Sequence, residues 1–76
     1  MPPLTPGALA EKLLRMARRR RPDLLELIDE LSRTKAGQAL ISKAFDSAYE
    51  AYVRSRSVDA AFDALVSYLE GAEEEY

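Results

Sequence analysis

The hydrophobic and polar residues of this chain recur with the period of an α-helix. The clearest stretch covers residues 39–53, where apolar residues come in pairs every four positions. At about 100° per residue these pairs fall on one broad face, which is typical of an amphipathic helix buried along its length. The small residues Ala44, Ala48 and Ala51 line the centre of this face and allow another backbone to come close. The pattern makes this segment the predicted centre of a helical bundle.

Three further segments show the same periodicity and carry signals for helix ends. Thr5 followed by Pro6 is a good helix start, because a proline at the first helical position has no N–H to leave unsatisfied. Pro22 disfavours helical geometry at the residue before it, so the first helix should end near residue 20. Asp23 with Glu26 matches an acidic form of the capping box and predicts the next start. The predicted helices cover residues 6–20, 23–33, 35–55 and 58–71.

The later connections contain four residues that mark helix boundaries. Thr34 can cap the third helix, and Ser57 can cap the fourth. Gly37 either ends the second helix or lies in the first turn of the third. Gly71 can end the fourth helix, in which case residues 72–76 form an acidic tail without a role in the core.

The length of the chain limits it to one domain. A chain of 76 residues buries only roughly 60% of its unfolded surface and cannot support two cores. We therefore predict an all-α fold, a small four-helix bundle over residues 1–76 organised around the long third helix, with residues 1–5 and 72–76 flexible. The small size and the wide apolar faces favour self-association, most simply as a homodimer.

The composition makes catalysis an unfavourable interpretation. The chain has no cysteine and no histidine, which removes disulfides, the usual zinc ligands and the usual general base. We predict that the protein is not an enzyme and has no cofactor, no metal site and no small-molecule substrate.

The hydropathy of the chain argues against a membrane protein. No apolar run approaches the roughly 18 residues of a membrane span, and the N-terminus lacks the apolar core of a signal peptide. We expect a cytoplasmic protein that does not contact membranes. The arginine-rich start also has some character of an organelle transit sequence, but its capping signals favour a structural role.

Charge is strongly segregated along the chain, although the net charge is only −2. Residues 1–21 contain six cations and one acid, whereas residues 58–76 contain six acids and no cation. Two segments of opposite charge either form ion pairs with each other, within one chain or between chains, or contact two separate partners.

The cations of the first helix are the best candidates for a binding surface. Arginine forks match the oxygens of phosphates and carboxylates, so the cluster predicts contact with an anionic partner. No aromatic residue is interleaved with the arginines, so contact with nucleic acid would be independent of base sequence. The alternative is that these cations bind no partner and only form a solvated helix face and a charged helix end. The residues that we expect to make the contact are Lys12, Arg15, Arg18, Arg19 and Arg21.

Our main hypothesis is a non-catalytic, self-associating interaction module whose basic first helix contacts an acidic protein surface or a nucleic-acid backbone. The alternative is a structural or assembly protein whose basic and acidic helices satisfy each other within an oligomer. A DNA-binding helix-turn-helix over residues 24–53 is a less favoured hypothesis. The longer helix is apolar over a wide arc, so few of its side chains remain exposed to contact base edges. The regular stripes and capping signals also meet design rules, so a designed origin stays open.

Overall fold

The computed structural model of the protein describes the backbone of residues 3–75 and the side chains of residues 3–72. Within this range all regular structure is helical, which confirms the predicted all-α four-helix fold. None of the helices in residues 3–75 has the length and apolar character that crossing a membrane requires. The four helices are α1 (Pro6–Arg20), α2 (Pro22–Leu31), α3 (Lys35–Ser55) and α4 (Val58–Glu75).

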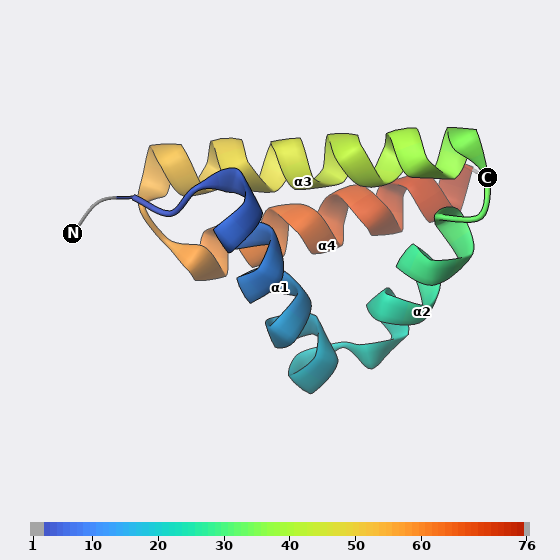
Figure 1. The fold of residues 1–76 in the computed structure, drawn as a ribbon, viewed down its shortest axis with the longest axis horizontal. Helices are drawn as coiled ribbons and strands as arrows, with labels where there is room; N and C mark the ends of the chain where they lie inside the picture. The colour runs from blue at the N-terminus through green and yellow to red at the C-terminus, as the bar shows by residue number, and fades with distance from the viewer. Residues whose placement is uncertain (1–2, 76) are drawn as a thin grey trace.

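The four helices form two pairs: α3 and α4 are long and antiparallel, and α1 and α2 are shorter and lie at an angle to each other. Helices α3 and α4 run side by side along the 38 Å long axis of the molecule (Figure 1). Helices α1 and α2 leave the two ends of this pair and meet away from it (Figure 1). Helix α3 is the longest and contacts each of the other three, as the sequence predicts.

Small residues lie at the centre of the α3–α4 pair. Ala44 and Ala48 of α3 and Ala61 of α4 are completely buried, so the two backbones approach closely. The predicted small-residue centre is confirmed, and only its last member, Ala51, is half-buried. Larger side chains fill the space toward α1 and α2, and each fully buried leucine contributes roughly 1.5–3 kcal/mol. The largest fully buried side chains are Leu9, Leu13, Leu24, Leu65 and Leu69.

Three predicted helix caps are confirmed. The hydroxyl oxygens of Thr5, Thr34 and Ser57 each accept a hydrogen bond from a backbone N–H three residues later, in the first turn of α1, α3 and α4. Each bond satisfies an N–H that has no partner within its helix. The donors are Ala8 (3.2 Å), Gly37 (2.9 Å) and Ala60 (3.1 Å).

The start of α2 differs from the prediction. The helix begins at Pro22, with Arg21 in the cap position and no side-chain hydrogen bond to the first turn. Proline suits the first helical position because its fixed φ is already helical. Asp23 therefore lies inside the first turn and does not cap the helix, and α2 ends at Leu31, earlier than predicted.

The predicted end of the fourth helix at Gly71 is wrong. Helix α4 continues to Glu75, and Ala72 is buried in the core. Gly71 has an ordinary negative φ, and the apolar stripe of α4 continues past it, so packing outweighs the helix-breaking tendency of one glycine. The part of the expected acidic tail after Ala72 lies outside the described side chains.

Gly37 fixes the corner between α2 and α3. It lies in the first turn of α3, the second of its two predicted places, and is buried. A Cβ at this position would overlap the carbonyl group of Leu31 and lie 2.8 Å from the Cα of that residue. The close approach of the two backbones requires a residue without a side chain.

Two tyrosines tie the segment before α1 to α3. The N–H of Leu4 donates to the hydroxyl of Tyr52 (3.1 Å), and the hydroxyl of Tyr49 donates to the carbonyl of Leu4 (3.4 Å). Leu4 belongs to the lead-in that we expect to be flexible, and Met1 and Pro2 lie outside the described residues. The two bonds hold Leu4, just before the start of α1, against α3.

Candidate functional site

Helix α1 exposes its cations because its apolar stripe faces the core. Leu9, Leu13, Met16 and Ala17 are buried, and the positions between them are turned outward. The exposed cations are Lys12, Arg15, Arg18, Arg19 and Arg20.

Three of the five predicted contact residues line one open groove. Lys12, Arg15 and Arg19 lie along the side of α1 that faces the start of α4. Their spacing of three and then four residues keeps them within about 60° on the helix. The groove holds about 440 Å³, and its other lining residues are Met16, Arg20, Ser57, Val58 and Asp59.

Arg20 is a groove residue that is absent from the predicted contact set. Its guanidinium donates to the carboxylate of Asp59 at 3.3 Å and lies over the ring of Phe62, 5.8 Å from the centroid. The ion pair is exposed, with 56% and 75% of the two side chains accessible, so solvent weakens it. In the sequence, the acidic Asp59 in the first turn of the fourth helix is the one feature that points to a partner for Arg20.

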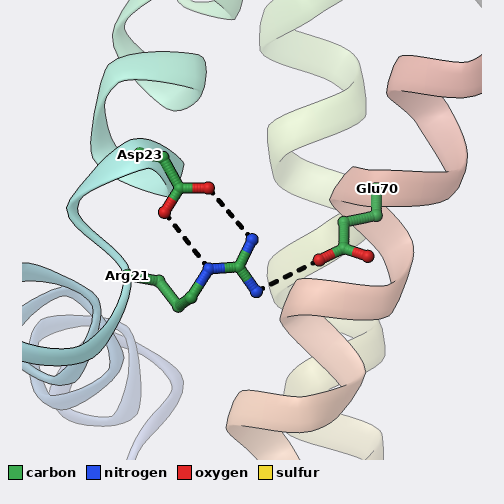
Figure 2. A network of polar contacts seen from close by, with 3 residues as sticks. All are labelled: Arg21, Asp23 and Glu70. Atoms are coloured by element: carbon green, nitrogen blue, oxygen red, sulfur yellow. Dashed lines mark hydrogen bonds and ion pairs between the residues drawn. The ribbon is translucent and has the colours of Figure 1, made fainter.

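Arg21 lies apart from the groove and is held by two other carboxylates. It forms a two-pronged contact with Asp23 (3.1 and 3.0 Å) and a third bond to Glu70 of α4 at 3.1 Å (Figure 2). The Arg21 guanidinium lowers the pKa of Asp23 through these hydrogen bonds. The contacts link the α1–α2 corner to α4 within one chain.

Arg18, the remaining member of the predicted set, is exposed and does not line the groove. Among residues 3–72, the side chains of Lys12, Arg15, Arg18 and Arg19 form no ion pair with a carboxylate. Within the described side chains, the six clustered cations therefore divide into three groove residues without an ion pair, one such residue outside the groove, and two that pair with acidic side chains.

The carboxylates of α4 are spread along the helix. Asp59 pairs with Arg20 and Glu70 pairs with Arg21, about eleven residues or roughly 16 Å further along at 1.5 Å per residue. The described residues contain no group of three or more acidic side chains placed to share a metal ion. Asp59 and Glu70 thus act as partners for arginines, whereas Asp63 forms no ion pair among residues 3–72.

Comparison of the chain with protein-family models, with curated proteins and with solved structures found no match in any of the three.

Proposed function

We propose that the protein is a non-catalytic interaction module that contacts an anionic partner through the basic surface of α1. The observation that carries the proposal is the convergence of Lys12, Arg15 and Arg19 on one open groove, without carboxylate partners among the described side chains. Cations left without partners beside an accessible groove are available to an incoming anion.

The chemistry of the groove supports recognition by charge and shape. The guanidinium groups can fork onto carboxylate or phosphate oxygens, and the side chain of Met16 gives the groove an apolar part. No aromatic residue is among the described residues that line it, so stacking on nucleic-acid bases is not part of the proposal. The contact is therefore electrostatic and strongly dependent on salt, because exposed charges are screened within a Debye length of about 8 Å at 0.15 M.

The alternative is an assembly protein whose opposite charges satisfy one another. It is favoured by the pairing of Arg20 with Asp59 and of Arg21 with Glu70, which join the basic and acidic ends inside one chain. Among the side chains of residues 3–72, this pairing leaves Lys12, Arg15 and Arg19 without a carboxylate partner, which is why we prefer the interaction module.

Binding of labelled anionic probes tests the proposal. Fluorescence anisotropy with poly-glutamate and with a short single-stranded DNA, both labelled, separates protein-like from nucleic-acid-like partners. We expect the variant with Arg15→Glu and Arg19→Glu to bind at least about ten-fold more weakly than the wild type to whichever of the two probes the wild type binds more tightly. If the probe is DNA, the plot of the logarithm of the association constant against the logarithm of the salt concentration should also become less steep. Its negative slope should shrink in magnitude by roughly 1.4, since two phosphate contacts are lost.

A matched control separates the groove from general charge. The variant with Lys43→Glu and Arg54→Glu changes the net charge equally at two exposed positions on α3. It should retain most of the binding. Equal losses in both variants, or binding that ignores salt, would contradict a specific surface on α1.

A further inference from the structure

Helices α1 and α2 carry opposite charges with the same spacing. On α1 the groove cations follow one another at intervals of three and four residues, and on α2 three carboxylates do the same. Both sets lie on one side of their helix over roughly 10 Å, at 1.5 Å per residue. The basic ridge is Lys12, Arg15 and Arg19, and the acidic ridge is Asp23, Glu26 and Glu30.

The acidic ridge borders a groove on α2, which has a single buried residue. Its three carboxylates line this groove together with Leu24 and Leu27. Leu24 is the one fully covered apolar residue of α2. The half-buried apolar residues of this helix are Leu25, Leu27, Ile28 and Leu31.

The two ridges do not satisfy each other inside one chain. The contacts between charged residues at the α1–α2 corner involve Arg21 and Asp23, and Asp29 of α2 pairs with Arg33 in the turn that follows this helix. Among residues 3–72, Glu26 and Glu30 form no ion pair, as is the case for the three cations of the basic ridge. Both ridges are exposed, and since Asp23 already pairs with Arg21, Glu26 and Glu30 are the carboxylates of the acidic ridge that are open to another molecule.

We propose that the anionic partner of the basic ridge is a second copy of this chain, which receives it on its acidic ridge. This inference rests on the proposed function of α1. Equal spacing lets each cation meet a carboxylate when the two helices lie along each other, and the aliphatic stems of the cations cover Leu27. Nucleic acid fits less well, because Asp59 lies in the groove and the chain is acidic overall.

The association is weak and sensitive to salt. Each exposed ion pair strengthens it only about two- to five-fold, and solvent screening reduces this as salt rises. We therefore expect self-association at high protein concentration and low salt, and its loss toward molar salt.

Charge reversal with complementation tests the proposal. One variant carries Arg15→Glu and Arg19→Glu, and the other carries Glu26→Arg and Glu30→Arg, so each presents two ridges of the same sign. Sedimentation equilibrium at low salt should show wild-type self-association and a dissociation constant at least about ten-fold higher for each variant alone. An equimolar mixture should associate again, since each ridge then meets one of opposite sign.

The control variant carries Asp46→Arg and Glu50→Arg, two exposed acids of α3 with the same spacing as Glu26 and Glu30. It should associate as the wild type does, and circular dichroism should show that all variants remain helical. A wild type that stays monomeric at low salt, or variants that do not associate when mixed, would overturn the inference.

The outcome also distinguishes this inference from the proposed function. A monomeric wild type that still binds DNA or poly-glutamate through Arg15 and Arg19 would reject the second copy and retain the anionic partner. A protein that binds neither probe and does not self-associate would reject both.

Discussion

Replacing Gly37 with alanine should destabilise the protein, although alanine is the better helix former. The Cβ of an alanine would overlap the carbonyl of Leu31, and the atoms that it meets belong to the backbone. Backbone atoms cannot avoid the new Cβ by a change of rotamer, as a side chain could. The backbones of α2 and α3 would therefore have to move apart at this corner. Overpacking of this kind costs roughly 1–3 kcal/mol, which exceeds the gain of at most about 1 kcal/mol in helix propensity.

The same substitution at Gly71 provides the matched control. Gly71 lies within α4 with an ordinary φ, and a Cβ there would meet nothing within 4 Å. Gly71→Ala should therefore stabilise the protein by up to about 1 kcal/mol. The two variants change the same atoms and differ only in surroundings.

Thermal and urea unfolding followed by circular dichroism measure both variants. For a domain of this size, 1 kcal/mol corresponds to roughly 4–8 °C in Tm. Gly37→Ala should lower the Tm, and Gly71→Ala should raise it by a few degrees. A Gly37→Ala protein as stable as the wild type would show that α2 and α3 do not approach as closely as described.

Three further substitutions test other contacts. Tyr52→Phe removes the acceptor for the N–H of Leu4, so urea unfolding should show a loss of about 1 kcal/mol. Arg56→Gly relieves a left-handed residue (φ 59°) at the end of α3 and should raise stability by about 0.5–1 kcal/mol; an unchanged value would argue against strain there. Arg21 lowers the pKa of Asp23, so this carboxylate stabilises the fold above its unfolded pKa of about 3.9 and less as pH falls through its folded pKa. Asp23→Asn should therefore weaken the loss of stability between neutral and acid pH, as measured by urea unfolding across pH.

The parts of the fold that were predictable are those fixed by local chemistry. Thr5, Thr34 and Ser57 were identifiable as caps because a cap joins a side chain to a backbone N–H only three residues away. The helical stripes were identifiable because the period of apolar residues reflects one buried face.

The helix ends that were missed depend on competition between signals. A glycine ends a helix only when the packing beyond it is too weak to continue, and Ala72 is buried past Gly71. At the start of α2, the proline at the first helical position competes with the capping signal of Asp23, and the proline prevails.

The candidate site was predictable in part for the same reason. Helical spacing alone places Lys12, Arg15 and Arg19 on one side of α1. The α4 partners of Arg20 and Arg21, Asp59 and Glu70, lie 39 and 49 residues away in the sequence, so only the fold reveals them. Tertiary contacts thus decide which cations of an arginine cluster remain free.

The groove between α1 and the start of α4 is the proposed binding site for an anionic partner. Titration of the ¹⁵N-labelled protein with the preferred anionic probe, followed by two-dimensional NMR, tests it residue by residue. We predict the largest shifts at Lys12, Arg15 and Arg19 and at residues 57–59, with little change at Lys43. Shifts concentrated on α3, or spread evenly over all exposed cations, would contradict it.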